Sequence, residues 1–300
     1  MVLRGTFTAI VTPFIKDRVD EEGLAYHIEK QIEAGITGIV FLGSTGEEAV
    51  LRPEERKRII EMAVERVQGR CLVIVGTGCS STQETVEKTA QARALGADMA
   101  LVVTPYYNKP NQEGIYLHFE KIVSSVDIPV IVYNNPGRTG VNIEVATLLK
   151  LAQLTSIVGV KEASGNMLHI ADVIHTVCAR YPGFSVLSGD DGMTLPALSL
   201  GAHGVISVIS NLVPKPLIDL VAMALNGDFL GARSIHNTLF SLMKMAFIEV
   251  NPTPIKSAMR LCGLPAGPCR LPLCAMKTEN QDKLAELLLQ MGLACSSNVL

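Results

Sequence analysis

Eight short apolar runs, roughly one every 30 residues, constrain the fold of this 300-residue chain more than any other feature. Each run is rich in Val, Ile and Leu, and each is followed by a polar, glycine-containing loop and a stretch with helical periodicity. Strands that are apolar at almost every position are typical of parallel sheets with both faces covered by crossover helices. We expect these strands at residues 6–11, 38–42, 72–76, 98–103, 130–133, 157–160, 185–187 and 205–208.

Eight strand–helix units predict an α/β fold, and specifically a (β/α)8 TIM barrel. A doubly wound open sheet has the same alternation of elements. That fold would be favoured by a GxGxxG turn after the first strand, whereas Thr12-Pro13-Phe14 follows it here. The barrel is therefore the preferred interpretation.

The strand–helix repeat ends after the eighth strand. From Phe229 onward only helical periodicity remains, at residues 231–250, 254–261 and 281–291. We therefore predict a barrel domain over residues 1–228 and a C-terminal helical domain over residues 229–300. This appendage carries no polar cluster at a strand end, so we do not expect it to be an independent catalytic unit.

Composition excludes several classes of function. With 26 Lys and Arg against 29 Asp and Glu, the net charge of −3 provides no basic field for nucleic acid or an anionic membrane. No stretch approaches the ~18 consecutive apolar residues of a membrane span. The first residues lack a charged segment followed by an apolar run of signal length, so we expect no signal peptide. The seven cysteines, Cys295 among them, lack the spacing of a zinc site, so we expect reduced thiols. These features predict a cytoplasmic protein without a metal or an organic cofactor.

A lysine follows the sixth predicted strand. If side chains alternate along this strand, Ile157, Gly159 and Lys161 share one side, and Val158 and Val160 share the other. The edge of an apolar interior disfavours a charged ammonium, and the free amine can form a Schiff base with a carbonyl. The alternative is a lysine whose stem packs while its ammonium reaches water.

The other strand ends also carry polar groups, and in a barrel these ends converge on one rim. Ser44 and Thr45 follow the second strand in a Gly-Ser-Thr-Gly-Glu turn. The hydroxyls and backbone N–H groups of this turn could bind a carboxylate. A tight turn without a binding role has the same sequence pattern. Tyr107 follows the fourth strand and could be an ordinary packing aromatic. Tyr133 ends the fifth strand, and Arg138 lies in the Pro-Gly turn behind it, where a guanidinium could hold a carboxylate or be one more surface cation.

Together these groups describe a Schiff-base aldol site for keto acids. Lys161 would condense with the ketone, and Tyr133 would move the protons. Because the ordinary pKa of a tyrosine, about 10, makes it a poor base alone, relay partners are needed, and Ser44 and Tyr107 are candidates. No phosphate-type glycine loop follows the seventh or eighth strand, which argues against a sugar-phosphate enzyme.

Four motifs give the chain a resemblance to the pyruvate-dependent class I aldolases, the family of dihydrodipicolinate synthases and N-acetylneuraminate lyases. They are Gly-Ser-Thr-Gly-Glu at 43–47, Tyr-Tyr-Asn at 106–108, Tyr-Asn-Asn-Pro-Gly-Arg-Thr-Gly at 133–140 and Val-Lys-Glu-Ala-Ser-Gly at 160–165. The resemblance covers nearly the whole chain. Arg138 resembles the synthases, since the lyases usually have no arginine there. Ser44 stands where most synthases have threonine, and it leans mildly toward the lyases.

The resemblance implies condensation of pyruvate with aspartate-4-semialdehyde to 4-hydroxy-tetrahydrodipicolinate, in diaminopimelate and lysine biosynthesis. It implies a homotetramer, a dimer of dimers, with no cofactor beyond the covalent Schiff base. By this resemblance, Lys161 is the Schiff-base lysine and Tyr133 is the proton shuttle, with Ser44 and Tyr107 of a neighbouring subunit as the proton relay. Thr45 would bind the carboxylate of pyruvate, and Arg138 would bind the semialdehyde. The carbonyl of Ile206 would face the site.

Two alternatives remain open at the level of the sequence. The first is an N-acetylneuraminate or sugar-acid aldolase of the same family, from which Arg138 discriminates. The second is a catalytically silent homologue that binds keto acids, which the joint presence of all these residues disfavours.

The resemblance also bears on feedback by lysine. Sensitive members bind lysine in a pocket where this chain keeps three matching residues but replaces the usual histidine and asparagine ligands. The matches are Ala49, Glu84 and Tyr106, and the replacements are Pro53, Arg56 and Ser80. We therefore predict weak or absent inhibition by lysine.

Overall fold

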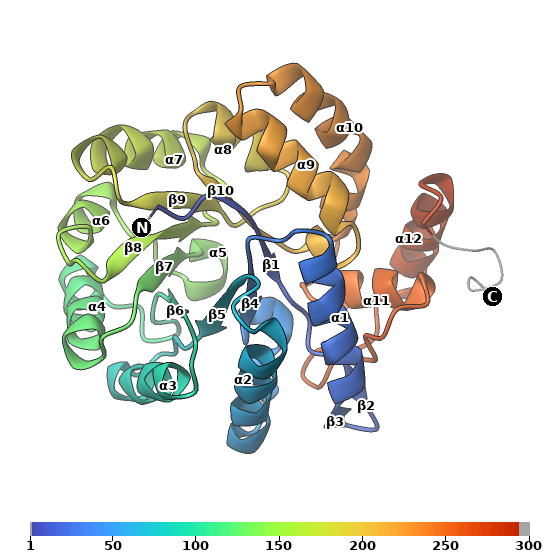
Figure 1. Ribbon diagram of the computed structural model, residues 1–300, viewed down its shortest axis with the longest axis horizontal. Helices are drawn as coiled ribbons and strands as arrows, with labels where there is room; N and C mark the ends of the chain where they lie inside the picture. The colour runs from blue at the N-terminus through green and yellow to red at the C-terminus, as the bar shows by residue number, and fades with distance from the viewer. Residues whose placement is uncertain (1, 294–300) are drawn as a thin grey trace.

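The computed structural model describes residues 2–293 and contains a closed barrel of eight parallel strands (Figure 1). Neighbouring strands follow the order β1-β10-β9-β8-β7-β6-β5-β4, and β1 pairs with β4 to close the barrel. The predicted TIM barrel is confirmed, and the open sheet is wrong because β1 has a partner on both sides. The strands are β1 Gly5–Ala9, β4 Gly38–Phe41, β5 Leu72–Gly76, β6 Met99–Val103, β7 Val130–Asn134, β8 Ile157–Glu162, β9 Ser185–Ser188 and β10 Gly204–Ser207.

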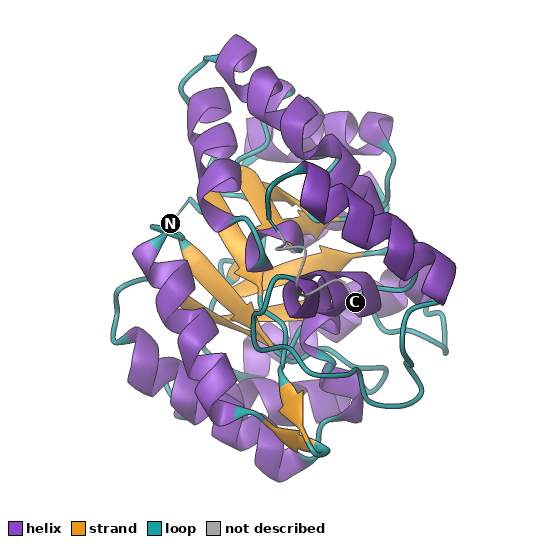
Figure 2. Ribbon diagram, turned by 90° about the vertical axis from the view of Figure 1, so that its right-hand side faces the viewer, coloured by secondary structure: helices purple, strands orange, loops and turns teal. Residues whose placement is uncertain are grey.

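Helices surround the strands, as the view in Figure 2 also shows. Two helix starts follow the local sequence signals. Ser81 caps α3 by accepting a hydrogen bond from the Glu84 amide at 3.3 Å, and Pro53 opens α2, where a missing N–H costs nothing. The helices of the barrel are α1 Glu21–Glu33, α2 Pro53–Val67, α3 Thr82–Ala94, α4 Gln112–Ser125, α5 Pro136–Thr139, α6 Val145–Leu151, α7 Met167–Val173, α8 Thr194–Ser199 and α9 Pro214–Leu225.

A small hairpin after β1 was not predicted from the sequence. Its strands β2 (Phe14–Ile15) and β3 (Arg18–Val19) have two residues each, too short to show any periodicity. The two turn residues Lys16 and Asp17 have φ of 49° and 58°, as a tight hairpin turn requires. Neither is glycine or asparagine, so the usual sequence signal is missing.

Side chains facing the barrel axis form one interior cluster, which includes Phe7, Ile131, Tyr133 and Leu187. The predicted alternation along β8 is wrong at its start. Ile157 packs with Val160 in the layer between strands and helices, whereas Val158 packs against the interior cluster. The cause is a register shift between β7 and β8 at Val130 and Ile131, which inserts one residue on the β8 side.

The three C-terminal helices are present as predicted, at α10 Phe229–Met245, α11 Thr253–Leu261 and α12 Thr278–Gln290. One apolar cluster joins them to the barrel, with Val205 of β10, Leu217 of α9, Met259 of α11 and Leu288 of α12 among its members. The three helices therefore share a core with β10 and α9 of the barrel. The domain boundary at residue 228 stays a prediction.

Three further findings concern the part of the chain that the structure describes. No helix within residues 2–293 is long and apolar enough to cross a membrane. No group of three or more His, Cys, Asp or Glu side chains in this range could hold a metal ion. No disulfide joins the cysteines of this range, and Cys295 lies outside the described residues.

Candidate active site

Two adjoining cavities lie at the carboxyl ends of the strands. The larger has a volume of about 280 Å³ and is bordered by the loops after β4, β6 and β7 and by the C-terminal segment. The smaller, of about 40 Å³, reaches Lys161. The residues that line both cavities are Gly43, Ser44, Leu101, Tyr133, Arg138 and Asn251. This rim is where barrel enzymes place their active sites.

Lys161 and Tyr133 occupy paired positions on β8 and β7. The Lys161 ammonium nitrogen lies 4.5 Å from the centroid of the Tyr133 ring. Lys161 is only 6% exposed, so the alternative of an ammonium that reaches bulk water is wrong. The strand also extends further than predicted, through Lys161 to Glu162, because the ladder with β7 continues to Asn134. The amine and the phenol therefore share one buried site.

The environment of Tyr133 favours its ionised form. Burial alone would raise the pKa of the phenol. This effect is outweighed, and the pKa of the phenol lies below its ordinary value. The causes are the charge of Lys161, a hydrogen bond from Asn135 Nδ2 at 2.9 Å, the charge of Arg138 and a hydrogen bond with Ser44. A phenol with a lowered pKa gives up its proton more readily, which suits a group that exchanges protons with its neighbours.

The turn after β4 and the loop before α11 meet at the rim. Thr45 lies in the short 3₁₀ helix η1 (Ser44–Gly46) and is buried. Asn251 Nδ2 donates a hydrogen bond to Thr45 Oγ1 at 2.9 Å, and the Asn251 carbonyl accepts one from Arg138 Nη2 at 3.0 Å. One residue of the C-terminal segment thus holds both a hydroxyl and a guanidinium at the cavity.

A second polar cluster fixes the ends of β7 and β8 from the outer side. Asn134 Nδ2 donates to Glu162 Oε2 at 2.8 Å, while Asn134 Oδ1 accepts from the Ile143 amide at 3.1 Å. The buried Glu162 carboxylate also accepts from the Ser164 amide at 2.7 Å. Because Asn134 and Glu162 directly follow Tyr133 and Lys161, these bonds restrain the two reactive side chains.

Two predicted site residues lie elsewhere. Tyr107 is 93% exposed, with φ of 73°, and its side chain does not line either cavity of its own chain. The Ile206 side chain packs in the interior cluster beneath the site. The role of its carbonyl stays a prediction. Of the predicted residues, the structure brings together Lys161, Tyr133, Ser44, Thr45 and Arg138.

Sequence reasoning missed Asn251 and Gly189. Asn251 lies between two helices in the C-terminal segment, outside the strand–helix repeat on which the search for strand ends relied. Gly189 follows β9, and a Cβ there would lie 3.1 Å from Lys161 Cε and 2.6 Å from Ala163 Cβ. The bare backbone of Gly189 therefore makes room for the lysine, a requirement that only the packed structure reveals.

Comparison with known proteins identifies the family of this chain. A model of the dihydrodipicolinate synthetase family matches residues 2–291. This chain belongs to that family. It is 53% identical over 289 residues to a 4-hydroxy-tetrahydrodipicolinate synthase from Protochlamydia amoebophila, with 96% of each chain covered. It is 46% identical over 293 residues to another from Methanocaldococcus jannaschii, covering 97% of this chain and 100% of the relative.

Solved structures of the family share the fold. The dihydrodipicolinate synthase from Aquifex aeolicus matches with a TM-score of 0.95 at 46% identity, covering 98% of this chain and 100% of the other. The one from Thermotoga maritima matches with a TM-score of 0.96 at 39% identity, with the same coverage of both chains. The resemblance expected from the four motifs is confirmed.

Charged residues beside the larger cavity are relevant to the prediction about inhibition by lysine. The buried Arg56 forms an ion pair with Glu48, and Lys88 Nζ lies 3.1 Å from Glu48 and 2.7 Å from Glu84. The hydrogen bond from Lys88 lowers the pKa of Glu84. Both carboxylates near Tyr106 are thus already paired with cations of this chain, which would repel the ammonium groups of a lysine ligand.

We therefore expect free lysine to inhibit the reaction weakly or not at all. The physical reason is that Arg56 and Lys88 occupy the acidic groups that a lysine ligand would need. Initial rates at saturating substrates, measured over a series of lysine concentrations, check this. Half-inhibition at a sub-millimolar concentration would contradict it.

Replacement of Gly189 by alanine should displace Lys161. The added methyl would overlap Ala163 and press on the lysine stem, and small displacements of a reacting group cost about 100-fold in rate. Trapping of a carbonyl compound on Lys161 with borohydride, followed by intact-mass spectrometry, measures the loss. Gly192→Ala is the matched control, because a Cβ there meets nothing closer than 3.4 Å. Equal trapping in both variants would argue against the role of Gly189.

Proposed function

We propose that this chain is a Schiff-base lyase that condenses pyruvate with aspartate-4-semialdehyde to 4-hydroxy-tetrahydrodipicolinate, a step of diaminopimelate and lysine biosynthesis. The observation that carries the proposal is the buried Lys161 amine 4.5 Å from the Tyr133 ring, in a cavity that Arg138 also lines. Relatives named 4-hydroxy-tetrahydrodipicolinate synthase, up to 53% identical over nearly the whole chain, support it.

In the proposed mechanism the Lys161 amine adds to the ketone carbon of pyruvate, and loss of water from the carbinolamine leaves a protonated Schiff base. Tyr133 gives the proton to the departing hydroxyl. Removal of a methyl proton then yields an enamine, whose carbon attacks the aldehyde of the semialdehyde. The amino group of the new adduct attacks the imine carbon, which closes the ring and returns the Lys161 amine. The mechanism requires no metal or organic cofactor.

The remaining groups have roles in binding and proton relay. Thr45 and the backbone of its turn bind the pyruvate carboxylate, and Arg138 binds the carboxylate of the semialdehyde. Ser44 links Tyr133 to the relay, since its hydroxyl already bonds the phenol. The carbonyl of Ile206 faces pyruvate.

Tyr107 completes the relay from a second copy of the chain in a homotetramer. Its 93% exposure is what a residue that serves a neighbouring subunit requires. Pyruvate, the semialdehyde and this assembly are the partners we propose, and we place the reaction in the cytoplasm with the rest of amino-acid biosynthesis.

Two other functions fit these residues less well. A sugar-acid aldolase of the same family would have no use for a guanidinium fixed on the Asn251 carbonyl beside the cavity. A silent homologue would have no need to keep the amine, the phenol with a lowered pKa and the hydroxyl turn together. The synthase reaction uses all of these groups.

Borohydride reduction in the presence of pyruvate tests the proposal directly. Intact-mass spectrometry and peptide mapping should find one reduced pyruvyl group on Lys161, with loss of activity toward pyruvate and aspartate-4-semialdehyde. Lys161→Arg is the control and should take up no pyruvyl group. Folded wild-type chain without an adduct would remove the proposal and favour a silent homologue.

Arg138→Ala should separate the two substrates. Loss of the guanidinium removes a charged hydrogen-bonding group for the semialdehyde, so turnover should fall about 100-fold, while the pyruvyl adduct still forms. Arg180→Ala, at another exposed arginine, is the matched control and should change neither measurement. Equal loss of adduct and turnover in Arg138→Ala would contradict the assigned role.

A further inference from the structure

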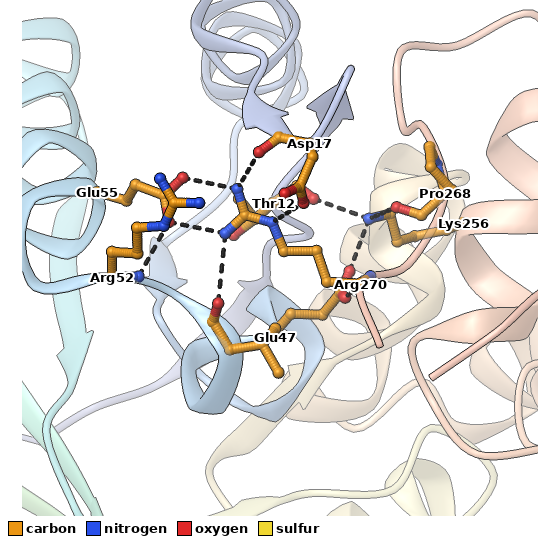
Figure 3. Close-up of polar contacts among 9 residues, drawn as sticks. Thr12, Asp17, Glu47, Arg52, Glu55, Lys256, Pro268 and Arg270 are labelled. Carbon is orange, nitrogen blue, oxygen red and sulfur yellow. Dashed lines mark hydrogen bonds and ion pairs between the residues drawn. The ribbon is translucent and has the colours of Figure 1, made fainter. Parts of the chain in front are cut away.

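A buried ion pair lies next to the site without touching either reactive side chain. Lys256 of α11 and Glu47, the residue that follows η1, are each only 1% exposed, and the Lys256 Nζ to Glu47 Oε1 distance is 2.6 Å. The other two ammonium protons are donated to the carbonyls of Thr12 at 3.0 Å and Pro268 at 2.9 Å. Figure 3 shows Lys256 meeting these partners. Every donor of this ammonium is therefore used.

Stability alone does not account for this pair. The free energy needed to remove two charged groups from water often equals or exceeds the free energy gained from their attraction. A protein with an apolar pair of similar volume at the same positions is often as stable. Burial lowers the pKa of Lys256, and the charge of the Glu47 carboxylate opposes this shift. The cost of burial and the attraction of the partner therefore act against each other at this lysine. A geometric role is the better explanation.

The pair joins the turn after β4 to two neighbouring segments near the end of the chain. Glu47 Oε2 accepts a hydrogen bond from the Arg270 amide at 2.9 Å, so the carboxylate connects the turn after β4 both to α11 and to the loop that follows α11. The Arg270 guanidinium continues the contact with two bonds to Glu55 of α2, at 2.7 and 2.6 Å. The C-terminal segment is thereby fixed against the barrel rim (Figure 3).

The same contacts restrain Gly46 and Glu47 at the end of the Ser44–Glu47 turn. The Glu47 amide donates to the Ser44 carbonyl at 3.2 Å, and Glu47 has φ of 55°, a left-handed conformation that a glutamate rarely adopts. The Thr12 hydroxyl donates to the Gly46 carbonyl at 2.7 Å, while the Thr12 carbonyl is held by Lys256. Lys256 therefore reaches the turn by two routes.

We propose that Lys256 and Glu47 are positioning residues, which hold the Ser44–Glu47 turn so that Ser44 meets the Tyr133 phenol and Thr45 presents its hydroxyl to the substrate carboxylate. Neither residue lines the smaller cavity that reaches Lys161, although Glu47 borders the larger one. The inference rests on the proposed function, because it assigns the carboxylate of pyruvate to Thr45. It predicts that loss of the pair weakens pyruvate binding more than it slows the chemistry.

Lys256→Met removes the ammonium and keeps most of the stem volume. The pyruvate concentration that gives half-maximal borohydride trapping on Lys161 should rise about tenfold or more, because small displacements of binding groups have large effects. The adduct formed at saturating pyruvate should remain. Glu47→Gln is the second variant, with the same expected shift, and it carries the test if Lys256→Met does not fold.

The double variant Glu47→Gln/Lys256→Met separates positioning from stability. With both charges removed no buried charge is left unpaired, so the midpoint of thermal unfolding should recover relative to Lys256→Met. The raised half-saturation by pyruvate should persist, because the turn is still unanchored. Recovery of both quantities together would overturn the positioning role.

Leu288→Ala is the matched control for a general loss of stability. Leu288 is fully buried in α12, in the core that the C-terminal helices share with the barrel. Its truncation should lower the unfolding midpoint without changing half-saturation by pyruvate. An unchanged half-saturation in folded Glu47→Gln and Lys256→Met would overturn the inference alone, whereas a wild-type chain without any adduct would overturn the proposed function and the inference with it.

Discussion

The pairing of β7 with β8 is the constraint on which the site depends. Their register sets Tyr133 opposite Lys161, and closure of the barrel buries both side chains in one interior. Burial makes the amine and the phenol sensitive to each other, since few water molecules screen their charges. On the outer side of the same two strands, the hydrogen bond between Asn134 and Glu162 holds the register beside Tyr133 and Lys161.

Around this pair, the rest of the molecule supplies fixed polar groups. The turn after β4 brings two hydroxyls, the turn after β7 brings a guanidinium, and the C-terminal segment holds both through Asn251. The segment is itself anchored by a buried lysine whose three donors are all satisfied. The helices after the barrel therefore support the site as well as sharing an apolar core with β10.

Particular elements show how far the sequence alone could lead. The barrel strands are almost uniformly apolar and similarly spaced, so all eight could be located. Tyr133 and Lys161 stand where such strands end, and Arg138 lies in a Pro-Gly turn, so these three cavity residues could be singled out from the sequence as well. The β2–β3 hairpin is too short to have a period, and the register shift in β8 depends on its neighbour β7, so neither leaves a local signal.

The sequence by itself determined the strand–helix repeat, the family and the amine, phenol, hydroxyl and guanidinium of the site, because periodicity and motifs are properties of neighbouring residues. Only the tertiary structure decided that Asn251 holds Thr45 across 206 residues and that Lys256 holds Glu47 across 209. It also decided that Gly189 makes room for Lys161 and that Tyr107 lines neither cavity of its own chain. Contacts between distant segments are fixed by packing, and packing leaves no pattern in either segment alone.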